Sequence, residues 1–129
     1  MTNAAAESTT CHQTVKVVTI PYTNPETHKV EYATHYSPET IRVTSCDTVI
    51  SYHLVEPTPK GVRFTGMTVT PEHTDQLSAP SISRSGRVMT TVDANTLSTT
   101  LNLDLKFDDG KGVCFSDDPE VVNEAPPAM

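Results

Sequence analysis

Residue types that mark nucleic-acid binding or membrane insertion are scarce in this sequence. The 129 residues include no tryptophan, four tyrosines, three phenylalanines, and only nine lysines and arginines against 16 aspartates and glutamates. The net charge of −7 would repel a phosphate backbone, and no cluster of basic residues opposes that repulsion. No apolar run approaches the roughly 18 residues that can span a bilayer. We therefore expect neither nucleic acid nor a membrane as a partner.

Cysteine is scarce too. The three cysteines, Cys11, Cys46 and Cys114, are odd in number and fit no Cys-x-x-Cys spacing. Residues 1–10 have neither the basic region nor the apolar region of a secretory signal. These features favour reduced thiols and a cytoplasmic location, with one disulfide and one free thiol left open as an alternative.

What the sequence has in abundance is threonine, valine and period-two alternation, all typical of strands. The clearest alternation lies between residues 97 and 107, where one parity is apolar: Leu97, Leu101, Leu103, Leu105 and Phe107. The opposite parity is polar, so one face of this strand should be buried. Residues 108–112 supply a glycine-containing turn, after which Val113 and Phe115 resume the apolar parity. The pattern predicts a β-hairpin with one apolar face.

Shorter strands are expected at residues 13–20, 28–36, 41–45, 47–55, 61–70 and 86–92, with a closing strand around Val121 and Val122. Residues 47–55 are apolar on nearly both faces, which is typical of a central strand. The turn after them predicts a hairpin with residues 61–70.

Two finer predictions concern which side chains face inward. Within residues 61–70 the apolar parity changes around Gly66, which predicts a β-bulge at Thr65 and Gly66. In residues 86–92, we expect Val88, Thr90 and Val92 to face inward.

About eight strands without an intervening amphipathic helix indicate an all-β fold with two antiparallel sheets packed face to face. We expect a disordered arm over residues 1–11, a β-sandwich domain over 12–123, and an extended tail over 124–129. Residues 71–85 read as a long connection between the two sheets.

Five acidic residues and one asparagine near the end of the chain are the candidates for ligand or partner contacts: Asp108, Asp109, Asp117, Asp118, Glu120 and Asn123. The loops at Asp108–Asp109 and Asp117–Glu120 could converge on a calcium ion, a sugar or another small ligand. The EF-hand spacing is not met, because Gly110 as the invariant glycine would put Leu105 at the first ligand position. Turn formation is the alternative, since aspartate often bonds its own backbone two residues on.

Catalytic motifs are not found. The five histidines show no metal-type spacing, and the nucleophile-elbow, phosphate-loop, dinucleotide and zinc-protease motifs are lacking. We therefore expect no catalytic residues, cofactor or metal, and a hydrolase with a dispersed Ser/His/Asp site stays open as an alternative.

The end of the chain resembles a known family. A glycine-containing hairpin precedes Asp118-Pro119, and Glu124-Ala125-Pro126 follows, with one residue interrupting a Glu-Pro pair. This ending resembles the DP-EP family of small bacterial proteins and, more loosely, the PixA/AidA-type inclusion-body proteins. The resemblance implies an immunoglobulin-like sandwich of seven to nine strands with no assigned biochemical role and no catalytic residues.

Taken as a hypothesis of function, these features favour a noncatalytic cytoplasmic β-sandwich that acts through protein contacts, either with another protein or with copies of itself. Exposed strand edges, which sheets must pair, cover or charge, support that view. A module for a small ligand, sugar or Ca²⁺ that uses the acidic loops is the alternative.

Overall fold

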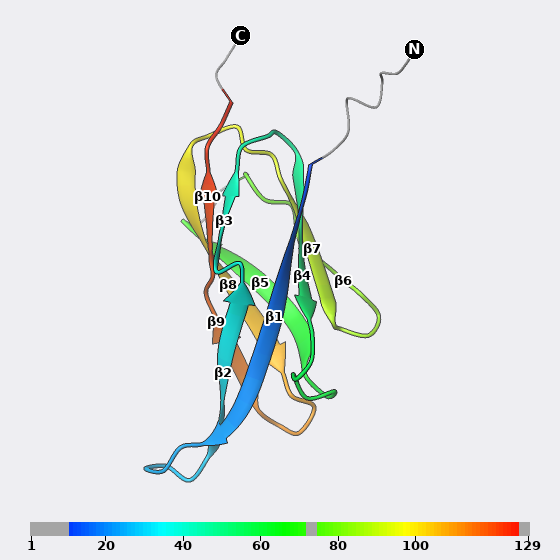
Figure 1. Cartoon of the computed structure of the whole chain (residues 1–129), viewed down its shortest axis with the longest axis vertical. Coiled ribbons are helices and arrows are strands. Elements are labelled where there is room, and N and C mark those ends of the chain that lie inside the picture. Colours follow the sequence, from blue (N-terminus) through cyan, green and yellow to red (C-terminus); the bar gives the residue numbers. More distant parts are fainter. Residues whose placement is uncertain (1–10, 72–74, 127–129) are drawn as a thin grey trace.

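The computed structural model describes residues 11–71 and 75–126, and within them the chain forms strands and no helix (Figure 1). The strands are β1 (His12–Thr23), β2 (Val30–Ser37), β3 (Thr40–Val43), β4 (Thr48–Leu54), β5 (Arg63–Thr70), β6 (Ser81–Ile82), β7 (Val88–Asp93), β8 (Thr99–Asp108), β9 (Cys114–Asp117) and β10 (Glu120–Asn123). The all-β prediction is confirmed. In the described ranges, no helix has the length and apolarity needed to cross a membrane.

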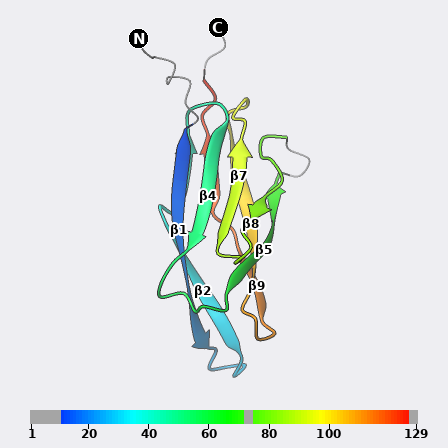
Figure 2. The same ribbon diagram turned by 90° about the vertical axis from the view of Figure 1, so that its right-hand side faces the viewer.

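The strands form two sheets that lie on either side of one apolar core. The first sheet has the order β2-β1-β4-β7-β6, and Figure 2 shows β1, β4 and β7 side by side. The second sheet has the order β3-β10-β8-β5, and β9 also pairs with β8. As predicted, β4 is central in its sheet and almost wholly buried. The predicted bulge is also confirmed, because the β5–β8 register shifts between Phe64 and Gly66.

Both sheets are mixed, so the prediction of purely antiparallel sheets is wrong. β1 pairs with β4 in parallel, and β3 pairs with β10 in parallel. Parallel neighbours cannot be joined by a tight turn, and here the connecting chain passes through other strands before it returns. Local turn signals identify hairpins between successive strands, and they carry no information on such distant pairs.

The described residues contain ten strands, more than the seven to nine predicted. The additional strand is β6, two residues that pair with β7 inside the segment predicted as a connection. The predicted hairpin between residues 47–55 and 61–70 is also wrong, because β4 and β5 belong to different sheets. Proline-rich residues 55–62 cross between the sheets instead of turning back within one.

The core is built from the inward faces of both sheets. Its buried apolar side chains are Val15, Val17, Ile41, Val43, Ile50, Tyr52, Leu54, Val62, Phe64, Met89, Leu101, Leu103, Leu105, Phe107 and Val121. The alternation of β8 therefore works as predicted from Leu101 to Phe107. Leu97 is an exception and is 60% exposed, because β8 begins only at Thr99.

The inward face of β7 differs from the prediction. Met89, Thr91 and Asp93 are buried, whereas Val92 is exposed. Counting valine as apolar and aspartate as polar assigned the wrong parity to this strand. Hydrogen bonds from the surrounding chain make the burial of Asp93 possible, and a binary pattern does not register them.

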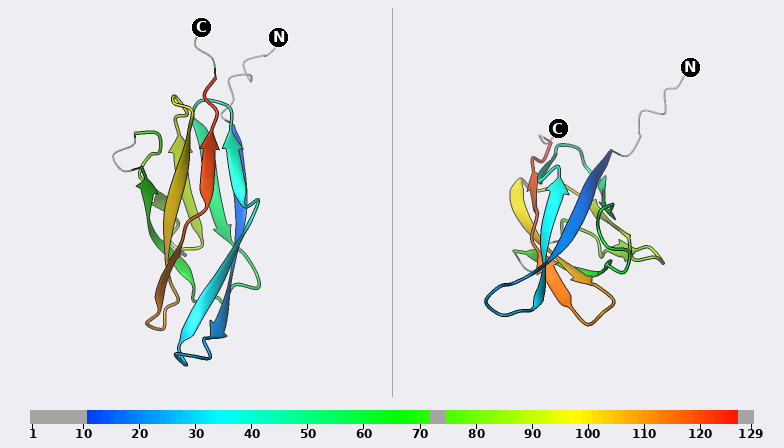
Figure 3. Two further views of the ribbon diagram at one scale, coloured as in Figure 1. Left: turned by 90° about the vertical axis from the view of Figure 1, so that its left-hand side faces the viewer. Right: turned by 60° about the horizontal axis from the view of Figure 1, so that its bottom comes forward.

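A column of stacked aromatic rings joins the edge of the first sheet to the second. Tyr32 on β2 stacks on Phe115 with ring centroids 4.3 Å apart, and Phe115 stacks on Phe107 at 4.9 Å. Phe64 continues the column at 5.1 Å from Phe107. The column lies toward the end of the molecule that carries the β1–β2 hairpin and the β8–β9 turn, while β1 begins and β10 ends at the opposite end (Figure 3).

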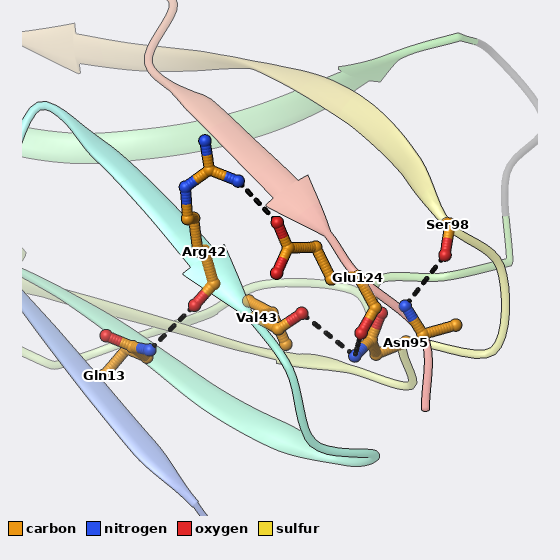
Figure 4. Close-up of polar contacts among 7 residues, drawn as sticks. Gln13, Arg42, Val43, Asn95, Ser98 and Glu124 are labelled. Atoms are coloured by element: carbon orange, nitrogen blue, oxygen red, sulfur yellow. Dashed lines mark hydrogen bonds and ion pairs between the residues drawn. The ribbon is translucent and has the colours of Figure 1, made fainter. Parts of the chain in front are cut away.

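The predicted flexible ends lie mostly outside the described residues, which exclude 1–10 and 127–129. Cys11 is described, and its carbonyl oxygen accepts a hydrogen bond from the backbone N–H of Val49. After β10, the backbone N–H of Glu124 donates to Val43 O. That of Ala125 donates to Ser98 Oγ, and Figure 4 shows this contact at Ser98. The first residues of the tail are thus bonded to the domain.

Candidate functional site

A groove opens where β2 passes into β3 and where β9 passes into β10. Its volume is about 480 Å³, and its acidic lining residues are Glu39, Asp117, Asp118 and Glu120. The chain leaves the first sheet after Ser37 and enters the second at Thr40, and Pro119 separates β9 from β10. Two interruptions of regular pairing therefore meet at one place and create a hollow. We call it the carboxylate groove.

The groove is strongly negative. Asp117 is half-buried, and Glu39, Asp118 and Glu120 are exposed. Among the described residues that line it, none is lysine or arginine, and His35 is the only imidazole. Four carboxylates around one hollow produce a potential that favours positively charged groups.

Tyr36 forms part of the groove wall, and the negative charge of the groove affects the pKa of its phenol. Burial, followed by the negative charge of Asp117, raises the pKa of the Tyr36 phenol well above its ordinary value of 10.0. Its ring meets that of Tyr52 edge-on, with centroids 6.2 Å apart, which anchors this wall in the core. Tyr36 therefore stays protonated at physiological pH, and its hydroxyl oxygen is buried behind the groove wall.

The structure brings together three of the six residues predicted from the sequence, namely Asp117, Asp118 and Glu120. Asp108 and Asp109 lie instead in the β8–β9 turn. Asp108 Oδ1 accepts a hydrogen bond from the Gly110 N–H at 2.6 Å. Asp108 thus bonds its own backbone two residues on, as the turn interpretation expects.

Asp109 is fully engaged in the same turn. Its Oδ1 accepts from the backbone N–H groups of Lys111 and Val113, and its Oδ2 accepts from the Tyr32 hydroxyl at 2.9 Å. Burial alone would raise the pKa of Asp109, but these hydrogen bonds outweigh it and lower the pKa. Burial, with the bond to Asp109, raises the pKa of Tyr32 to about 12. With both oxygens occupied, Asp109 shapes the hairpin and has little capacity for a ligand.

Asn123, the sixth predicted residue, is buried at the other end of β10 from Glu120 and does not line the groove. Its Nδ2 donates to Asp93 Oδ1 at 2.9 Å and to Gln76 Oε1 at 3.3 Å. Asn95 completes this buried polar cluster, since its backbone N–H donates to Asp93 Oδ1 at 3.0 Å. At the end of β10, the side-chain amide of Asn123 therefore bonds to other side chains and is not directed at a ligand on the surface.

Sequence reasoning missed Glu39 and Tyr36 in the groove, and Asp93 and Asn95 in the buried cluster. Glu39 lies about 80 residues before its neighbours, so no local pattern could associate them. A signal for the cluster did exist. Asp93 ends β7, and Ala94 and Asn95 follow it directly. Asn95 adopts the left-handed region at φ 53°, which asparagine tolerates.

A serine–histidine contact occurs on the outer face of the first sheet, where His12 Nε2 lies 3.4 Å from Ser51 Oγ. A hydrolase needs a third group that orients the histidine, and no carboxylate bonds to His12 in the part of the chain that is described. Over the same residues, no group of three or more His, Cys, Asp or Glu is arranged to hold a metal ion. All three cysteines are unpaired and exposed.

Fold and groove together define an all-β protein with two mixed sheets and a negatively charged surface groove. The chain belongs to the DP-EP family, which matches residues 12–125. That match confirms the resemblance seen at Asp118-Pro119, while the looser likeness to PixA/AidA-type proteins stays a prediction. No curated protein gives a significant match to the chain.

Proposed function

We propose that this protein is a noncatalytic binding protein that acts through contacts with other protein chains, and that the carboxylate groove binds a positively charged segment of the partner. The observation that carries the proposal is the groove itself, in which four carboxylates surround one hollow and none of the described lining residues is lysine or arginine. Opposite charges across an interface speed association and select the partner. A lysine or arginine side chain also matches the hydroxyl and carboxylate acceptors on the groove wall.

Self-association is one form of this proposal. A second copy would have to present exposed basic residues such as Arg84 or Lys111 to the groove. Each copy carries a net charge of −7, so repulsion between copies opposes that arrangement. A basic segment of a different protein therefore fits the groove better.

Binding of a small ligand is a second candidate function, with fewer of the predicted acidic residues available for it. Asp109 has both oxygens bonded, and Asp108 has one bonded in the turn and the other facing the Cys114 thiol at 3.8 Å. The Asp117–Glu120 loop therefore suits a ligand better. The same charge that suits a lysine side chain suits a small cationic molecule such as a polyamine.

Two finer points belong to the proposal. A cytoplasmic location is supported by three exposed, unpaired cysteines, which suit a reducing compartment. An immunoglobulin-like type of sandwich is supported by the passage of β2 and β3 from one sheet to the other. An experimental structure superposed on immunoglobulin domains would test that assignment.

The direct test uses a fluorescein-labelled peptide of alternating lysine and glycine, with alternating glutamate and glycine as the comparison. The lysine peptide should bind, and its affinity should fall as salt is added because exposed charges are screened. The triple variant Glu39→Gln, Asp118→Asn, Glu120→Gln should bind about tenfold more weakly, equivalent to about 1.4 kcal/mol. Fluorescence anisotropy measures both effects.

A matched control removes three carboxylates elsewhere on the surface: Glu26→Gln, Asp47→Asn and Glu56→Gln, all at exposed residues. It has the same net charge as the groove variant and should keep nearly wild-type affinity. Equal weakening in both triple variants would show that net charge alone attracts the peptide. Either that result or undetectable binding to the wild-type protein would refute the proposal that the carboxylate groove binds a positively charged segment. Spermine in place of the peptide tests the small-ligand form.

A further inference from the structure

A buried polar cluster lies at the end of the molecule where β7 and β10 terminate. Asp93, Asn95 and Asn123 are 0%, 0% and 2% exposed. Asp93 ends β7 in the first sheet, and Asn123 ends β10 in the second. The 2.9 Å hydrogen bond between them therefore links the two sheets directly.

The orientations of the two amide groups follow from their partners. Asn95 Nδ2 donates to the carbonyl oxygens of Val43, Ser45 and Glu124 at 3.1, 3.3 and 3.2 Å, and Figure 4 shows two of these contacts. A flipped amide would place its oxygen against three acceptors, so this orientation is the only compatible one.

Asn123 is oriented in the same way. Its Nδ2 faces Asp93 Oδ1 and Gln76 Oε1, and Gln76 Oε1 already accepts from the backbone N–H groups of Thr96 and Leu97. Both partners of Asn123 Nδ2 are therefore acceptors. The remaining amide oxygen of each asparagine is fixed in place as an acceptor.

Three oxygens of this cluster accept no hydrogen bond from any residue that the structure describes: Asp93 Oδ2, Asn95 Oδ1 and Asn123 Oδ1. Leaving a buried polar group without a partner costs about 1–3 kcal/mol, and more when it is charged. While Asp93 is ionised all three atoms are acceptors, so they cannot pair with one another.

The carboxylate of Asp93 also has no counter-charge. In the described ranges, no lysine, arginine or histidine bonds to it, and burial raises its pKa against the lowering effect of the bonds from Asn123 and Asn95. The charged groups around the cluster are exposed: Asp47, Asp75 and the Arg42–Glu124 ion pair. Buried charges in proteins are paired or bound to metal ions.

We propose that Asp93, Asn95 and Asn123 form a buried site for one monovalent metal cation, Na⁺ or K⁺. Carboxylate and amide oxygens are hard ligands of the kind that alkali and alkaline-earth ions prefer. A single positive charge neutralises the single carboxylate, whereas a divalent ion would leave excess charge in the core. An ion lying between the three oxygens would satisfy all of them, whereas one water has only two hydrogens to donate. The ion would hold the ends of β7 and β10, and therefore the two sheets, together.

Thermal unfolding tests the site. The wild-type protein is dialysed into choline chloride, and choline is then replaced stepwise by NaCl or KCl at constant ionic strength. A ligand that binds only the folded state raises stability with its concentration, so Tm should rise by at least about 2 °C. The rise should shrink as the pH is lowered, because protons compete with the ion for Asp93. Asp93→Asn should lose the response, and Glu26→Gln, an equal change of charge at an exposed residue outside the groove, should keep it.

An identical wild-type Tm in choline, sodium and potassium would overturn the proposal, as would an equal response in Asp93→Asn. A Tm that ignores these ions but falls with rising pH would show that a proton takes the place of the metal. If Asp93→Asn does not fold, crystals of the wild type grown in rubidium chloride decide the question. An anomalous peak between the three side chains supports the site, and its absence overturns it.

Discussion

Asn95 offers a sharp test of how the end of the sandwich is held together. Its side-chain amide donates to three carbonyl oxygens from two separate segments, the end of β3 with the chain just after it and the chain after β10. Its backbone lies in the left-handed region at φ 53°. Replacement by glycine removes the amide and keeps this backbone easily accessible, whereas replacement by alanine removes the amide and strains the backbone.

The expected magnitudes follow from what each carbonyl retains. Val43 O still accepts from the Glu124 N–H at 2.8 Å, and Ser45 O still accepts from Thr48 Oγ1 at 2.8 Å. Among the described residues, Glu124 O has no second donor of this kind, so it loses its hydrogen bond when the Asn95 amide is removed. Two donated N–H groups at about 1 kcal/mol each give a loss of about 2 kcal/mol for Asn95→Gly. The left-handed backbone adds about 1 kcal/mol for Asn95→Ala, or about 3 kcal/mol in total.

Urea unfolding in choline chloride measures these losses without a contribution from sodium or potassium. Asn102→Ala is the control, because Asn102 is exposed on the polar face of β8, and its change should stay within about 0.5 kcal/mol. Wild-type stability of Asn95→Gly would refute the role of the amide. Equal stabilities of the glycine and alanine variants would refute the role of the left-handed backbone.

The remaining predictions concern the core, two glycines and one carboxyl group. Leu103 is fully buried, so Leu103→Ala should lower the free energy of unfolding by about 2–5 kcal/mol in urea. Gly86 and Gly112 both have positive φ, but an added Cβ at Gly86 would lie 2.4 Å from Arg63 Cβ, whereas at Gly112 it would meet nothing within 4 Å. Gly86→Ala should therefore lower Tm more than Gly112→Ala in a thermal melt. The folded-state pKa of Asp93 is raised above 3.8, so its contribution to stability is complete below that pH and is lost as the pH rises through the folded pKa. Asp93→Asn should remove this dependence in urea titrations at several pH values in choline chloride, and an unchanged pH profile would contradict the assignment.

The strands and their buried faces could largely be predicted, because period-two alternation reports directly on which face meets the core. Leu101, Leu103 and Leu105 are buried as their alternation predicts, and the parity change at Gly66 is a real bulge. The same rule was wrong for β7, where Asp93 is buried and Val92 is exposed. Partner groups from distant strands decide whether a polar side chain can be buried, and no local pattern contains them.

The candidate sites also combine features that the local sequence predicts with features that depend on distant segments. The acidic character of Asp117, Asp118 and Glu120 could be read from the chain, and so could the tendency of Asp108 to form a turn. The position of Glu39 beside them could not, because it depends on where the chain passes from the first sheet to the second.

The sequence by itself determined that this protein is all-β, where most strands run, and which side chains of β8 form the core. Only the tertiary structure decided that β1 lies parallel to β4 and β3 parallel to β10, that four carboxylates surround one groove, and that Asp93 meets Asn123. The physical reason is one of range. Alternation and turn chemistry act over a few residues, whereas sheet order and polar burial are set by contacts between segments 30 to 80 residues apart.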